Sequence, residues 1–151
     1  MANKKISELT AKALQIEDTD LIMISDYNGA TYDTKSVTGA NIRPFTTLSF
    51  VLSQASTSAP TKVYSYETEV SQTFTLARTS VGLYTLTASS ALFTANKTFV
   101  TISNGIGGAG IIVGAYRAST TVISFYSSDS VTQATIDNVL DNATLEIKII
   151  K

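Results

Sequence analysis

The sequence predicts a mainly β protein: an N-terminal docking segment with a β-hairpin, then a linker, then an antiparallel β-sandwich of jelly-roll-like type. Ser and Thr together account for 41 of the 151 residues, whereas charged residues make up 15% and hydrophobic residues 44%. Thr, Val and Ile favour strands because their branched side chains pack well on a pleated sheet. Several segments also alternate apolar and polar residues, as a strand with one buried face requires.

The charged residues divide the chain into two regions. Of the 23 charged residues, 11 lie in the first 43 positions, whereas only Lys97 and Arg117 are charged between Thr79 and Ser128. Between the regions, residues 53–61 are small and polar and include a proline, which is typical of a linker. We therefore expect a docking segment over residues 1–52, a linker over 53–61 and a sandwich domain over 62–151.

The docking segment contains the clearest local signal. Residues 21–27 and 30–36 have the composition of strands, and Asn28-Gly29 between them is the dipeptide preferred in type I′ hairpins. Upstream, Ile6, Leu9, Ala13 and Leu14 recur at helical spacing and predict a short amphipathic helix or turn. A two-stranded hairpin is marginally stable alone in water, so another surface must complete it.

The sandwich strands follow from alternation and from the turns that bound them. In the last strand, Leu145, Ile147 and Ile149 are expected on the buried face. Residues 136–140 have apolar residues at helical offsets, which predicts one helical turn. Seven strands of the sandwich are expected over residues 62–69, 73–78, 83–88, 98–103, 111–117, 121–126 and 145–151, and an extended segment of the docking region is expected over residues 45–52.

Composition argues against most catalytic and cofactor chemistry. The chain contains no His and no Cys, so it lacks imidazole bases, thiolate nucleophiles and the usual zinc and iron–sulfur ligands. We therefore expect a protein that is not an enzyme, with no catalytic residue, no cofactor and no metal site. The net charge of -1 offers no basic surface for a phosphate backbone, so nucleic acid is not an expected partner.

Two further motifs have simple structural interpretations. The segment 105–110 has the spacing of a dinucleotide-binding loop, but residues 111–117 after it have the character of a strand instead of the helix that would hold a pyrophosphate. We therefore expect a glycine-rich hairpin loop. Asp129, Asp137 and Asp141 could converge with Glu146 in a carboxylate site, although isolated acidic residues in loops are usually solvated turn residues.

The tyrosines and the charge-poor region each leave two interpretations open. Tyrosine rings could form a sugar-binding face, or they could pack in the core or in an interface. The uncharged stretch between Thr79 and Ser128 is either a solvated Ser/Thr surface or a self-association surface, and the second interpretation predicts a homo-oligomer. The candidate glycan or interface residues are Tyr64, Tyr66, Tyr84, Tyr116 and Tyr126.

Two regions of the sequence resemble parts of tailed-bacteriophage fibre and appendage proteins. Residues 5–10, 17–26 and 34–42, together with the Asn-Gly hairpin, resemble a virion-attachment segment. Residues 74–87, 93–99, 116–117 and 145–149 resemble a small β-sandwich head domain of phage fibre proteins.

This resemblance implies a virion structural protein, a homotrimeric head fibre or capsid decoration at the virion surface that is made in the host cytoplasm. Capsid or other virion proteins are the implied partners, without membrane insertion. The alternative is a tail-associated receptor-binding tip that recognises host surface carbohydrate. The expected attachment residues are Ile6, Leu9, Leu14, Leu21, Ile22, Ile24, Tyr27 and Tyr32.

Overall fold

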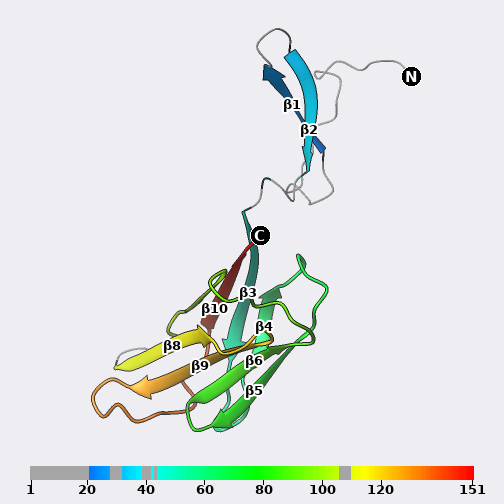
Figure 1. Ribbon diagram of the computed structural model, residues 1–151. Helices are drawn as coiled ribbons and strands as arrows, with labels where there is room; N and C mark the ends of the chain where they lie inside the picture. The colour runs from blue at the N-terminus through cyan, green and yellow to red at the C-terminus, as the bar shows by residue number, and fades with distance from the viewer. Residues whose placement is uncertain (1–20, 28–31, 39–41, 43, 106–109) are drawn as a thin grey trace. The chain divides into compact units, whose positions relative to one another are not determined.

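The chain is divided into two compact units. The computed structural model describes residues 21–27, 32–38, 42, 44–105 and 110–151. One unit comprises Met1–Pro44 and the other Phe45–Lys151 (Figure 1). Each unit is built of antiparallel strands, so the expectation of a mainly β protein with antiparallel sheets is confirmed.

The described part of the first unit is the predicted hairpin. Strand β1 (Leu21–Tyr27) pairs antiparallel with β2 (Tyr32–Thr38), and Tyr27 is the partner of Tyr32 at the closed end. The predicted Asn28-Gly29 turn itself lies outside the described residues.

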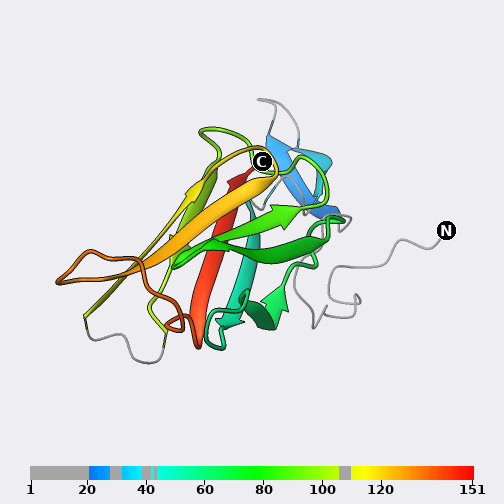
Figure 2. The same ribbon diagram turned by 90° about the horizontal axis from the view of Figure 1, so that it is seen from below.

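The second unit is a sandwich of two four-stranded antiparallel sheets. The strand order is β4-β3-β10-β7 in one sheet and β5-β6-β9-β8 in the other. Figures 1 and 2 show the two layers, with β5, β6, β8 and β9 lying across β3 and β10. The bounds are β3 (Phe45–Ser53), β4 (Thr61–Tyr66), β5 (Phe74–Ser80), β6 (Leu83–Ala88), β7 (Thr98–Ile102), β8 (Ile111–Arg117), β9 (Val122–Asp129) and β10 (Ala143–Ile150).

The structure places the domain boundary earlier than the sequence analysis did. Strand β3 pairs with both β10 and β4, which makes it a central strand of the sandwich and not the end of the docking segment. Consequently the expected linker over 53–61 corresponds to the connection between β3 and β4. Polar composition marked a loop correctly, but it could not distinguish a loop inside a domain from a linker between domains.

The core lies between the inner faces of the two sheets. The alternation expected in the last strand is present, because Leu145, Ile147 and Ile149 are all buried. Phe50 and Phe74, one from each sheet, meet edge to face with ring centroids 5.4 Å apart. Other fully buried side chains come from both sheets and from two loops: Leu48, Leu52, Tyr84, Leu86, Phe93, Ile123, Phe125 and Leu140.

Two local predictions in the sandwich are wrong. Residues 136–140 form bends and not a helical turn, because the backbone of Ile136 pairs with Ser127 and Leu140 turns into the core. The glycine-rich segment is not a hairpin loop, since β7 pairs with β10 and β8 pairs with β9 in the other sheet. That segment therefore joins the two sheets, and a strand follows it, as expected.

Candidate functional site

The outer side of the β5-β6-β9-β8 sheet has a surface without charged side chains, which we call the charge-free face. Along each strand, residues alternate between the core and this face. The outward positions combine hydroxyl groups with apolar and aromatic side chains. They are Thr75, Ala77, Thr79, Leu83, Thr85, Thr87, Ile112, Gly114, Tyr116, Val122, Ser124 and Tyr126.

A shallow hollow of about 160 Å³ lies on the charge-free face. Its lining includes Tyr116 and Tyr126, together with the hydroxyl-bearing Thr85 and Ser124. Tyr116 is 57% exposed, whereas Tyr126 is only partly accessible. The hollow therefore presents aromatic and hydroxyl groups but no ionised group.

Gly114 on β8 makes this arrangement possible. A Cβ atom at Gly114 would lie 2.5 Å from both Cζ and the hydroxyl oxygen of Tyr126, so the tyrosine ring covers the glycine backbone. The two residues are direct partners across β8 and β9. An aromatic ring laid over a strand glycine fills the volume that the missing side chain leaves.

The opposite outer face, on the β4-β3-β10-β7 sheet, has different chemistry. Its central strand β10 carries Glu146 and Lys148, which form an exposed ion pair with a 2.9 Å separation. The aromatic side chains Tyr64 and Phe99 are exposed, but they belong to the edge strands β4 and β7. The Glu146–Lys148 ion pair therefore lies between the exposed aromatic groups of the two edge strands.

The structure separates the five tyrosines proposed as contact residues into three environments. Tyr64 and Tyr66 belong to β4, whereas Tyr116 and Tyr126 both line the hollow on the charge-free face. Tyr84 is 1% exposed and stacks on Phe125 with ring centroids 5.3 Å apart. Tyr84 is thus a core residue, and its assignment as a surface contact is wrong.

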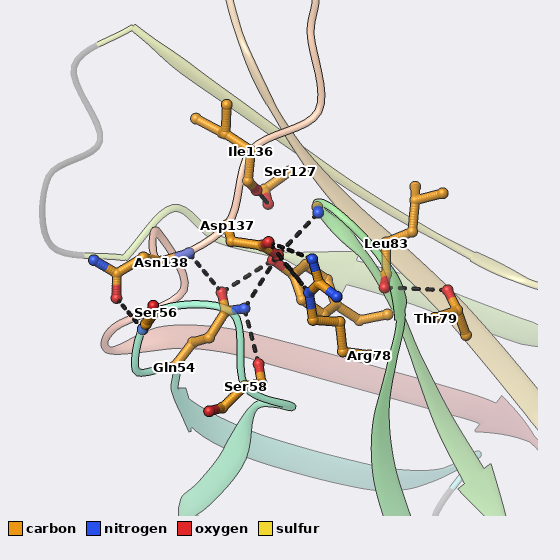
Figure 3. A network of polar contacts seen from close by, with 12 residues as sticks. Gln54, Ser56, Ser58, Arg78, Thr79, Leu83, Ser127, Ile136, Asp137 and Asn138 are labelled. Carbon is orange, nitrogen blue, oxygen red and sulfur yellow. Dashed lines mark hydrogen bonds and ion pairs between the residues drawn. The ribbon is translucent and has the colours of Figure 1, made fainter.

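The described residues also contain a polar network centred on Asp137 (Figure 3). Arg78 on β5 donates from Nε to Oδ1 of Asp137 at 3.0 Å and from Nη2 to Oδ2 at 2.7 Å. The amide of Gly82 donates to Oδ1 at 3.0 Å, and the Tyr84 hydroxyl lies 2.9 Å from the same oxygen. Asp137 therefore joins the β9–β10 connection to the turn between β5 and β6.

Gln54 extends the network to the β3–β4 connection. It is buried, and its Oε1 accepts a hydrogen bond from the amide of Asn138 at 2.9 Å. Its Nε2 donates to the carbonyl of Ser58, and its Oε1 lies 3.0 Å from the Tyr84 hydroxyl. Three connections between strands are thus held together at one end of the sandwich.

Gly82 has a specific steric role in the same place. Its φ angle is +62°, and a Cβ atom there would lie 2.5 Å from the carbonyl oxygen of Ser127 and 2.7 Å from the amide of Ile136. Only glycine adopts this backbone conformation without strain and permits such a close approach. The turn between β5 and β6 can therefore present its amide to Asp137.

The network has clear electrostatic consequences. Hydrogen bonds from Arg78 hold the pKa of Asp137 well below its usual range despite burial, with further contributions from the Gly82 amide and the Tyr84 hydroxyl. Burial raises the pKa of Tyr84. The carboxylate is therefore ionised at neutral pH, and its oxygens already accept hydrogen bonds from the protein. This arrangement is suited to clamping loops together.

The other candidate carboxylates have local roles. Asp129 accepts hydrogen bonds from the amides of Val131 and Thr132, and these bonds, led by those from Thr132, lower its pKa. Asp141 accepts a hydrogen bond from the Ser53 hydroxyl. In the part of the chain that the structure describes, no group of three or more acidic residues could hold a metal ion.

Sequence reasoning missed the Asp137 network and the role of Gly114. One signal for the network was Arg78, a cation that interrupts an otherwise uncharged strand and therefore requires a partner. The partner could not be identified from sequence because Asp137 lies 59 residues away. Gly114 within an apolar strand was a signal of close approach, but it did not indicate which ring would cover it.

The expected attachment residues are only partly within the described structure. Leu21, Ile22, Ile24 and Tyr27 lie in β1, and Tyr32 begins β2. Their proposed role remains a prediction. Ile6, Leu9 and Leu14, with the predicted amphipathic helix, lie outside the described residues.

Comparisons with known proteins assign no family: no family model matches the sequence, and no curated protein or solved structure matches it. Within the described ranges, we find no helix with the length and apolar character needed to cross a membrane.

Proposed function

We propose that this chain is a structural protein of a tailed-bacteriophage virion, a homotrimeric head fibre or capsid decoration. Its N-terminal segment anchors it to the particle, and its β-sandwich projects outward. The observation that carries the proposal is the division after Pro44 into a hairpin unit and a sandwich with its own core. The trimeric state and the jelly-roll-like connectivity are parts of this proposal.

The hairpin unit supports a role in attachment. Two strands without a further sheet partner are marginal in water, so they gain stability when a larger surface buries one side. In this proposal the attachment surface is a capsid or other virion protein, contacted by residues of β1 and β2 and of the segment before them.

The geometry of the sandwich supports a projecting role. Phe45, which begins β3, is the pairing partner of Ile150 near the end of β10, so the chain enters and leaves the sandwich at the same end. The three connections joined by Asp137 lie at the opposite ends of these strands. An anchor before Phe45 would leave this clamped end free to face outward.

Labelled particles test the proposal. We would attach a gold-binding tag after Lys151 and image particles of the phage whose genome encodes the chain. Label on the capsid is expected, label at the tail tip would favour the receptor-binding alternative, and particles without the protein would contradict both.

A matched pair of variants tests the anchor. Ile24→Asp in β1 is expected to prevent incorporation into particles, because a charge would oppose burial of the hairpin. Val131→Asp introduces the same side chain at a position that is 86% exposed, and it should be incorporated normally. Equal incorporation of both variants would argue against attachment through the hairpin.

One observation favours the alternative of a carbohydrate-binding tip. Tyr116 and Tyr126 line a hollow with hydroxyl groups around them, and aromatic rings beside hydroxyls suit a neutral sugar. A glycan array probed with the intact chain and with Tyr116→Ala tests this alternative. It requires binding by the intact chain that the substitution abolishes.

A further inference from the structure

We propose that the charge-free face is the surface through which copies of this chain pack together, with the face directed toward the symmetry axis of the homotrimer. This inference rests on the proposed function and adds the surface that joins the copies. The occupant of the face is therefore a second copy of the same chain.

The first argument is the continuity of the face. The hollow includes residues from β6, β8 and β9, and Tyr126 lies on β9 between its partners Leu83 and Gly114. Leu83, Ile112 and Tyr116 are all exposed on the same side. On the opposite sheet, the Glu146–Lys148 ion pair interrupts the surface instead. In the described part of the chain, the charge-free face offers an apolar surface that continues over β6, β9 and β8 without a charged group.

The second argument is symmetry. Near a rotation axis, each residue approaches the same residue of the neighbouring copies. An ammonium or carboxylate group at such a position would face its own charge, which is unfavourable when water is excluded. The absence of charge from all the outward positions of four strands satisfies this requirement.

The third argument is the chemistry of the polar groups that remain. A hydroxyl group both donates and accepts hydrogen bonds, so it can pair with the same hydroxyl of another copy. Ammonium groups only donate and carboxylates only accept, so neither can pair with itself. Thr85, Ser124 and the tyrosines supply hydroxyl groups on this face. The hydroxyl groups of the charge-free face can therefore form hydrogen bonds with the same groups of another copy.

Matched lysine substitutions in the full chain test the inference. Thr85→Lys places an ammonium on the charge-free face, and Thr101→Lys places one on β7 of the opposite sheet. We expect light scattering at micromolar concentration to give a trimer for the native chain and for Thr101→Lys. Thr85→Lys should show a threefold lower mass, with unchanged circular dichroism.

Two further samples keep the test decisive. Tyr116→Ser removes an exposed ring without disturbing the core, so it reports on association even if Thr85→Lys unfolds. A mixture of Thr85→Lys and Thr85→Glu chains should regain oligomers, because opposite charges then meet at the axis. A trimer that persists in both Thr85→Lys and Tyr116→Ser overturns the inference, as does a native chain that is monomeric.

The outcomes distinguish this inference from the proposed function. Incorporation into virions with trimers insensitive to Thr85→Lys would refute the interface alone. Trimers that Thr85→Lys dissociates, in a chain that never enters particles, would refute the virion role alone. Binding of a neutral saccharide at Tyr116 by the native oligomer would assign the face to a ligand and overturn the inference.

Discussion

On the β4-β3-β10-β7 sheet the central strand β10 carries Glu146 and Lys148 on its outer face, whereas the outer face of the β5-β6-β9-β8 sheet carries no charged residue. The inner faces do not differ in this way. Leu86 and Leu145, for example, are both fully buried in one shared core. Folding therefore imposes the same requirement on the inner faces of both sheets and leaves their outer faces free to differ.

This comparison separates residues that specify the fold from residues available for recognition. A solvated sheet face ordinarily carries charged side chains, which oppose edge and face association. Packing of the core does not require that charged side chains be absent from the outer face of one sheet. This difference between the outer faces motivates the proposed association of copies, and the inner faces provide the control.

The largest expected effects come from two matched core substitutions. Leu86→Ala and Leu145→Ala each remove a fully buried side chain, one from each sheet. Each should lower the free energy of unfolding by about 2–5 kcal/mol, because apolar contacts are lost and a cavity remains. Urea denaturation at equal protein concentration should show one transition in both variants. Separate transitions for the two sheets would contradict a shared core.

An intermediate effect is expected from Asp137→Asn, which disturbs the clamp between connections from both sheets. The amide retains the shape but loses the charge-assisted bonds to Arg78, and we expect a cost of about 2 kcal/mol at neutral pH. Unfolding midpoints measured beside those of Glu146→Gln provide a control. That exposed ion pair should contribute less than about 1 kcal/mol.

The same substitution has a pH signature. Because the folded-state pKa of Asp137 lies below its unfolded value, its ionised form stabilises the protein above the unfolded pKa. This contribution is lost as the pH falls below about 4 toward the folded-state pKa. The native chain should therefore lose more stability on acidification than Asp137→Asn. Parallel acid sensitivity of the two proteins would show that Asp137 does not make this contribution.

The sequence was sufficient to predict most of the sandwich strands but not the contacts between distant segments. Alternation identified the buried side of the last strand, because burial on one face has a period of two. The domain boundary failed because β3 pairs with β10, a contact that no local pattern contains. Local periodicity also misassigned residues 136–140, where tertiary contacts determine the backbone.

The candidate site was predictable to a smaller extent. Sequence reasoning identified the uncharged stretch and included Tyr116 and Tyr126 among five candidate tyrosines. It could not distinguish these two surface residues from the buried Tyr84. Hydroxyl-bearing and apolar residues occur on both faces of the strand that contains Tyr84. Which side faces the core depends on the pairing of β6 with β5 and β9. Such pairing is a property of the whole fold.

The smallest expected effect concerns the Tyr126 ring that covers Gly114 on the charge-free face. Gly114→Ala would displace the Tyr126 ring, since the added Cβ atom would lie 2.5 Å from it. We expect a cost of about 1 kcal/mol, typical of a modest steric conflict. In a Tyr126→Ser background the conflict disappears, and the same substitution should be neutral or slightly stabilising because alanine restricts the unfolded chain more than glycine does.

A double-mutant cycle on these two positions measures the coupling directly. Its second readout is the mass of the assembly in light scattering. A displaced ring should weaken association of Gly114→Ala relative to Glu146→Gln, whose substitution lies on the opposite face. An equal cost of Gly114→Ala with and without the Tyr126 ring would show that the ring does not occupy the space above the glycine. In that case Gly114 would not position the Tyr126 ring on the charge-free face.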